Sequence, residues 1–241
     1  MSAIGAIVTV TLRGLLGRRR AILMLLLAAL PVLVGLLIRL GGGRADAPEI
    51  LDTLVIRTVL PLIALIIGTS TIGSEIEDGT LVFLLVKPIP RWHIALAKIA
   101  VAAGLTAVLV VPPILLTGVL VGGFGAASLA TTFGYAVAAI AGGVAYACAF
   151  TALGTVTSRA LIVGLAYTLL WEGVLAGLLE GTRFLSIRQA TLGLAAALTG
   201  EDPGVEALDP AVAAVMIMAV VMGSMALTTI ALQRFQVRSS D

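Results

Sequence analysis

Six long runs of apolar residues divide the chain, and they constrain its fold more than any other feature of the sequence. A helix that crosses the hydrocarbon layer of a membrane needs roughly 20 mostly apolar residues, and each run reaches that length. Because 60% of the residues are hydrophobic and only 12% are charged, a soluble fold of 241 residues could not bury all of its apolar surface. We therefore expect an all-α membrane protein, embedded in a lipid bilayer as a single transmembrane domain over residues 1–241. The six predicted transmembrane helices lie near residues 21–40, 51–73, 94–121, 129–156, 160–180 and 210–233.

The lysines and arginines that flank these spans predict the orientation of the chain. Most of them, including the arginine cluster at residues 18–20, fall on the side that would hold both termini. Since such residues favour cytoplasmic loops, we expect a multi-pass protein of the cell membrane with both termini in the cytoplasm. Within residues 182–209, the stretch 184–200 is fairly apolar but carries Arg188 and Gln189. If this segment crossed, the C-terminus would lie outside, so it is predicted to be re-entrant on the outer face before span six.

The N-terminal residues 2–17 place apolar side chains at helical spacing before the arginine cluster. This pattern predicts an amphipathic helix in the cytoplasmic membrane interface, and an unstructured terminus is the alternative. The first apolar run also resembles a secretory signal. Its apolar stretch is longer than the ~7 to 15 residues of a signal core and further spans follow, so we expect a retained helix.

The loop between the second and third spans, residues 74–91, differs in chemistry from the rest of the chain. Ser74 followed by Glu77 has the spacing of a capping box, in which the two side chains bond the free N–H groups that open a helix. Lys87 and Pro88 would end that helix. The pattern predicts a short cytoplasmic helix at the membrane surface, which offers a rigid contact for a soluble partner. An ordinary amphipathic connector is the alternative.

The same loop resembles the signature loop of the ABC type-2 (ABC-2) exporter permeases. The residues that carry the resemblance are Glu75-x-Glu77-x-Gly79-Thr80-Leu81-x-x-Leu84-Leu85-x-x-Pro88-Ile89-x-Arg91, with Lys98 following. The resemblance implies that the loop is a coupling helix that docks on an ATPase subunit. It also implies a dimer, with a second copy of the chain or a homologous permease, on two cytoplasmic ABC ATPase subunits. The coupling role would fall to Glu75, Glu77, Gly79, Thr80 and Arg91. The family exports many classes of molecule, so no substrate follows.

The lysines of the chain argue for a separate ATPase. A P-loop needs a Gly-Lys-Ser/Thr core to hold phosphates, and neither Lys87, between Val86 and Pro88, nor Lys98 fits one. We therefore expect that the chain is no enzyme by itself and binds no cofactor, and that ATP and Mg are held by the partner subunit. The net charge of +2 is too small to suggest nucleic acid as a partner.

Two charged residues lie inside predicted spans, at similar depths in the outer half of the membrane. Arg57 is in the second span and Glu172 in the fifth. Charges at such depth are costly without a partner, so we expect an Arg57–Glu172 ion pair that lines or seals the outer pathway. Alternatively, Arg57 reaches the outer interface and Glu172 faces a polar interior. A protonatable Glu172 also keeps open a secondary transporter or channel, and an accessory membrane scaffold is a third possibility.

Prolines and small residues mark two further spans. Pro112 and Pro113 remove two backbone donors and predict a kink in the third span, either a gate or a static bend. Gly134, Ala138 and Gly142 follow one another at intervals of four residues and predict close helix packing on one face of the fourth span. We find no spacing of catalytic or metal-binding residues, so none are assigned.

Overall fold

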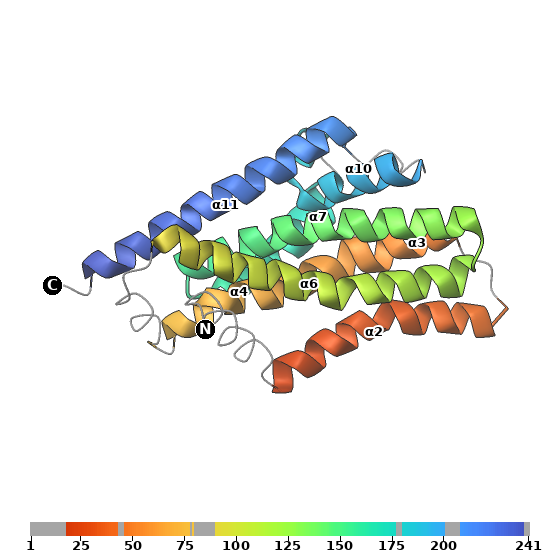
Figure 1. Ribbon diagram of the computed structural model, residues 1–241, viewed down its shortest axis with the longest axis horizontal. Helices are drawn as coiled ribbons and strands as arrows, with labels where there is room; N and C mark the ends of the chain where they lie inside the picture. Colours follow the sequence, from red (N-terminus) through yellow and green to blue (C-terminus); the bar gives the residue numbers. More distant parts are fainter. Residues whose placement is uncertain are drawn as a thin grey trace.

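The computed structural model describes residues 18–42, 46–77, 79, 90–176, 180–200 and 208–238, and regular structure within these ranges is entirely helical (Figure 1). The predicted interfacial helix at 2–17 and most of the predicted loop, residues 80–89, lie outside them. The helical elements in chain order are α2 (Arg18–Leu40), α3 (Ala47–Ile50), η1 (Leu51–Val59), α4 (Leu60–Glu77), α6 (Arg91–Gly122), α7 (Ala126–Val156), α8 (Ala160–Ala166), η2 (Tyr167–Leu175), η3 (Glu180–Leu185), α10 (Ile187–Thr199) and α11 (Pro210–Arg238).

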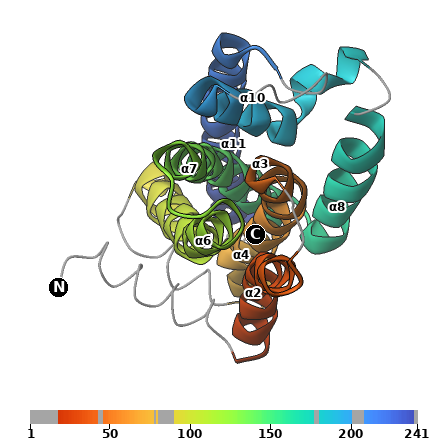
Figure 2. The ribbon, with the colours of Figure 1, turned by 90° about the vertical axis from the view of Figure 1, so that its right-hand side faces the viewer.

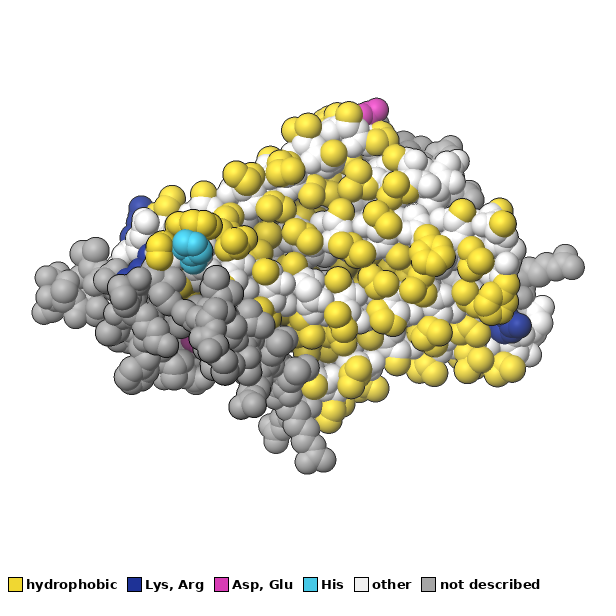
Figure 3. Space-filling model, viewed as in Figure 1, with side chains coloured by type: hydrophobic (Ala, Val, Ile, Leu, Met, Phe, Trp, Pro, Cys, Tyr) yellow, Lys and Arg dark blue, Asp and Glu magenta, His cyan; other side chains and the backbone are white. Residues whose placement is uncertain are grey.

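Five helices in the described part of the chain are long and apolar enough to cross a membrane, which confirms the all-helical membrane class. The fifth predicted span forms a shorter apolar helix over Ala160–Leu175. One face of the molecule shows hydrophobic side chains along its length, with lysine and arginine at both ends (Figure 3). The membrane-length helices are Arg20–Leu40, Ala47–Ile76, Arg91–Gly122, Ala126–Val156 and Pro210–Arg234.

Helix α7 lies at the centre of the bundle. Two thirds (67%) of its most apolar stretch is buried, against 11% for α11 at the periphery. It contacts α4, α6, α10 and α11, and α8 stands to one side when the bundle is viewed from its end (Figure 2). The approach of α4 to α7 depends on glycine. A Cβ at Gly68 would lie 2.7 Å from the Phe150 Cβ, and one at Gly154 would lie 2.9 Å from the Thr69 carbonyl oxygen.

The small-residue stripe of α7 lies against α10. A Cβ at Gly134 would be 2.5 Å from the Thr199 Cγ2, and one at Gly142 would be 2.2 Å from the Thr191 Oγ1. Ala138, between the two glycines, is fully buried. The order of these contacts makes α10 run in the direction opposite to α7. The absence of larger side chains is what allows the two helices to approach this closely.

The bundle has two ends that we name by their residues. At the loop end, α4 finishes at Glu77 and α6 begins at Arg91; at the far end, α6 finishes at Gly122 and α7 begins at Ala126. Figure 1 shows the loop end on the left and the far end on the right.

Candidate functional site

Ser74 does not cap a helix, so the predicted capping box is wrong. Helix α4 continues without a break from Leu60 to Glu77, four residues beyond the predicted end of the second span. Within it the Ser74 hydroxyl donates to the Ser70 carbonyl oxygen at 2.7 Å. A serine hydroxyl can bond the preceding turn of its own helix, so the residue type that often starts a helix is here accommodated inside one.

Lys98 and Glu75 join α6 to the last turn of α4. The Lys98 Nζ atom lies 2.6 Å from the Glu75 Oε1 atom and donates to the Thr71 carbonyl oxygen at 3.1 Å. The Lys98 side chain is fully buried and that of Glu75 is 21% exposed. Because a buried ammonium group is costly without compensation, these contacts hold the two helices together where they meet the predicted loop.

The chain leaves α4 through a turn at Gly79. Its amide donates to the Ile76 carbonyl oxygen at 3.2 Å, and its φ of +67° lies in the left-handed region that favours glycine. The residue is exposed, with open space where a Cβ would project. Arg91 begins α6 on the other side of the predicted loop. The Glu77 side chain and Thr80 lie outside the described residues.

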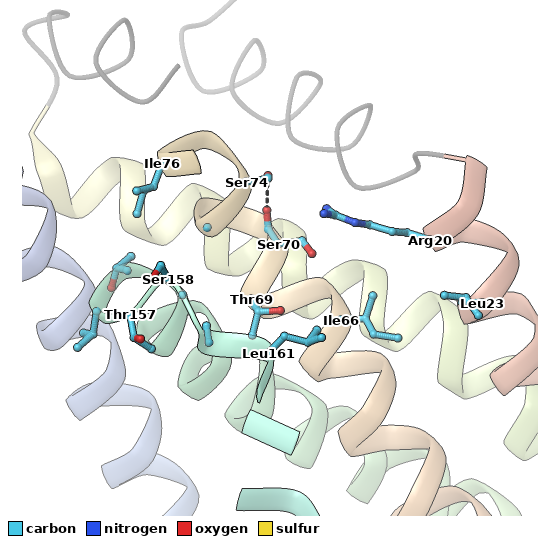
Figure 4. A pocket seen from close by; sticks show the side chains of 15 residues that line it. Arg20, Leu23, Ile66, Thr69, Ser70, Ser74, Ile76, Thr157, Ser158 and Leu161 are labelled. Carbon is cyan, nitrogen blue, oxygen red and sulfur yellow. Dashed lines mark hydrogen bonds between the residues drawn. The ribbon is translucent and has the colours of Figure 1, made fainter. Parts of the chain in front are cut away.

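A cavity of about 630 Å³ opens at the loop end between α2, α4 and the connection from α7 to α8 (Figure 4). Hydroxyl side chains of Ser70, Ser74 and Ser158 line it, and Arg20 extends from α2 toward α4. The apolar side chains of α2, α4 and α8 form another part of the lining. Sequence reasoning missed this cavity because its residues come from separate helices that no spacing rule connects.

Glu172 lies at the junction of three elements, where four groups donate to its carboxylate. The Tyr146 hydroxyl of α7 lies 2.5 Å from Oε2, and the Tyr167 hydroxyl of η2 lies 3.2 Å from Oε1. Ser186 Oγ lies 3.2 Å, and the Arg188 amide nitrogen 3.0 Å, from the same Oε1 atom. Glu172 is 1% exposed. Three of these donors converge on Oε1 and one contacts Oε2, so both oxygens of this buried carboxylate are hydrogen-bonded.

The same contacts fix the start of α10. Ser186 is its N-cap and accepts from the Gln189 amide at 3.2 Å, while Glu172 accepts from the amide of Arg188 in the first turn. A carboxylate at this position complements the free N–H groups and the positive end of the helix. The chain after η2 therefore returns to the level of Glu172 before α10 begins.

Arg57 does not pair with Glu172, so that predicted ion pair is wrong. The guanidinium group contacts Asp52, with Nη2 at 3.0 Å and Nε at 3.1 Å from Oδ2. Both residues lie in η1, a π-helix. Because a π-helix places residues i and i+5 on the same face, Asp52 is brought next to Arg57. Sequence reasoning assumed α-helical geometry and did not consider this neighbour.

Pro112 and Pro113 lie inside α6, which is one helix from Arg91 to Gly122. Pro113 is buried and Pro112 is exposed. The residues that sequence reasoning missed at the Glu172 centre are Tyr146, Tyr167 and Ser186. One signal was available: the chain has three tyrosines, and all of them lie in predicted spans, where a hydroxyl group needs a partner. The described residues include no group of His, Cys, Asp and Glu that could hold a metal ion.

Membrane-length apolar helices with a hydrogen-bonded carboxylate inside the bundle define a polytopic integral membrane protein. Residues 40–162, about half of the chain, match the family model described as ABC-2 family transporter protein. The chain belongs to that family, and it is accordingly a membrane transport permease. The search of curated proteins found no match.

Proposed function

We propose that this chain is the transmembrane permease subunit of an ATP-binding cassette exporter. It forms the substrate pathway as a dimer, with a second copy or a homologous permease, and two separate cytoplasmic ATPase subunits bind ATP and Mg. The observation that carries the proposal is the family match, because residues 40–162 include the whole loop at 74–91. The loop is the docking site, and Glu75, Glu77, Gly79, Thr80 and Arg91 contribute to it.

The proposed layout has six spans with both termini in the cytoplasm of a cell that carries the protein in its cytoplasmic membrane. Residues 160–176 form the fifth span, and residues 182–209 form an outer re-entrant segment. The contact between Glu172 and the start of α10 supports this layout, because it brings residues 186–188 back to the depth of a residue inside the fifth span. Non-helical backbone is tolerated at such depth where protein groups satisfy it.

Coupling follows from how the loop joins the spans. ATP binding draws the two ATPase subunits together and displaces the docked loop. Lys98 and Glu75 make the ends of α4 and α6 move as one body, since their ion pair crosses between the helices within a turn or two of the loop. Because α4 and α7 are closely packed at Gly68 and Gly154, a displacement of α4 also displaces α7.

Co-purification of the tagged full-length chain from its native host tests the proposal. We expect an ABC ATPase subunit to accompany the wild-type chain and to be lost from Glu77→Lys, which reverses a charge in the docking loop. Glu49→Lys is the matched control, because Glu49 is an exposed acid at the far end and its variant should retain the ATPase. No associated ATPase, or export driven by a proton gradient in liposomes that lack one, would contradict the proposal.

A further inference from the structure

We propose that the loop-end cavity binds one anionic amphiphile, with its acidic head at Arg20 and the serine hydroxyls and its apolar tail along α2, α4 and α8. The first observation is charge. Arg20 is exposed, points into the cavity, and makes no hydrogen bond or ion pair within the described residues. The described lining holds no Asp or Glu, so the guanidinium charge is uncompensated there. A guanidinium fork is suited to phosphate and carboxylate groups.

The second observation is which hydroxyl protons remain available. Thr69, Ser74 and Thr155 donate to carbonyl oxygens of their own helices at 2.7, 2.7 and 2.6 Å. They therefore offer only lone pairs to the cavity. Within the described residues, the hydroxyls of Ser70 and Ser158 donate to no protein group, so their protons are free for a ligand. Arg20, Ser70 and Ser158 thus supply donors from three elements around one space (Figure 4).

The third observation is that Arg20, Ser70 and Ser74 line the part of the cavity toward the loop end, together with Ile76, whereas Leu23, Ile66 and Leu161 line the part further along the helices. Ser74 and Ile66 are roughly two turns apart on α4, which is about 12 Å along the helix axis. Leu23 and Leu161 line the cavity with Ile66, and both are about half exposed, at 55% and 51%. In the proposed layout the polar part lies at the headgroup level and the apolar part lies in the hydrocarbon layer. A volume of about 630 Å³ is within the usual range for a ligand site.

An acidic membrane lipid and an exported amphiphile share this chemistry, and binding can be tested without any ATPase. The purified full-length chain in an uncharged detergent is titrated with phosphatidylglycerol or phosphatidylcholine of the same acyl chains, and occupancy is read by native mass spectrometry. We expect one phosphatidylglycerol to bind in preference to phosphatidylcholine. Arg20→Gln should weaken this binding about tenfold to a hundredfold, as expected for hydrogen bonds to a charged group.

Two variants separate a built site from general attraction to acidic lipid. Arg234→Gln removes an exposed arginine at the same end but outside the cavity lining, and it should leave the preferred binding unchanged. Gly73→Leu keeps every charge and places an apolar side chain in the cavity beside Ser74, and it should weaken the binding. A Cβ at Gly73 would lie 3.7 Å from the Gly154 carbonyl oxygen, an ordinary contact, so the backbone can stay in place. Equal loss in the two arginine variants, or unchanged binding to Gly73→Leu, would overturn the proposal.

Two further arms distinguish the possible ligands. Inorganic phosphate at millimolar concentration should displace phosphatidylglycerol only weakly, and full displacement would overturn the contribution of the apolar lining. The second arm alone rests on the proposed function and uses the chain reconstituted with its ATPase. ATP-dependent movement of a fluorescent phosphatidylglycerol across the bilayer, reduced by Arg20→Gln, supports an exported amphiphile. Binding without movement supports a resident lipid, and failure of ATPase coupling leaves the binding result intact.

Discussion

At the scale of single residues, Glu172 is the most constrained polar group described in the bundle. Its carboxylate joins α7, η2 and the first turn of α10 through hydroxyl and amide donors. The Tyr167 hydroxyl is also 3.1 Å from the Leu185 carbonyl oxygen, so its single proton serves one of two acceptors at a time. A carboxylate held in this way fixes the position of a helix, and its contacts favour an anchoring role over proton transport.

Replacing Glu172 with Gln should destabilise the protein by about 1–3 kcal/mol, because a buried donor loses its acceptor or meets an amide N–H group. The measurement is the apparent melting temperature of the purified chain in detergent. Tyr146→Phe should lower it as well, and the double variant should lose less than the sum, since both changes remove the same hydrogen bond. Glu49→Gln is an exposed control that should change little. Additive losses would contradict a direct Tyr146–Glu172 contact in the folded protein.

The Lys98–Glu75 ion pair gives a second prediction with an asymmetric outcome. Glu75→Gln removes a counter-charge 2.6 Å from a fully buried ammonium group and should cost about 3 kcal/mol. Lys98→Met should cost less, because the remaining Glu75 side chain is partly exposed and the new side chain is apolar. Melting temperatures of the two variants and of the Glu75→Leu/Lys98→Met pair provide the check. If the two single variants melt alike, burial of the lysine does not govern the stability of this pair.

At the scale of helices, packing through small residues determines where α10 lies. Gly142→Leu should overpack the contact with Thr191 and lower stability by about 1–3 kcal/mol. Gly104→Leu is the matched control, because a Cβ added at Gly104 on α6 has no neighbour within 4 Å. Both variants make the same change in helix propensity, so the difference between their melting temperatures reports the packing contact. An equal effect of the two substitutions would exclude close α7–α10 packing.

Long apolar runs allowed the membrane-length helices to be predicted from the sequence, since span length is set by the thickness of the bilayer. The small-residue spacing in α7 indicated a packing face but could not identify α10 as its partner. Local hydrogen-bond geometry was not predictable. The π-helical turn that places Asp52 beside Arg57 leaves the pattern of apolar residues unchanged, and Ser74 has the same sequence context whether it starts a helix or lies within one.

At the scale of the whole molecule, a central α7 is surrounded by helices that are less buried. Helix α4 connects this centre to the loop end, and α10 connects it to the far end. Both helices contact α7 through glycines, but α10 is also held at its start by hydrogen bonds to Glu172. A displacement of α4 at the loop would therefore reach α10 through α7, with the Glu172 centre as the fixed point.

This arrangement requires that α10 and the start of α11 stay on the side opposite the loop, which labelling can test. In a Cys148→Ser background, which removes the single cysteine of the chain, we introduce Gly200→Cys at the far end or Ser158→Cys at the loop end. A membrane-impermeant maleimide added to intact cells should label the first variant, and should label the second only after permeabilisation. Arg234→Cys should behave like Ser158→Cys, because α11 returns the chain to the loop end. Labelling of Arg234→Cys in intact cells would mean that the segment before α11 crosses the membrane. Five segments would then cross the membrane between the loop and the C-terminal end of α11. The loop and that end would lie on opposite sides of the membrane, and the six-span layout would be excluded.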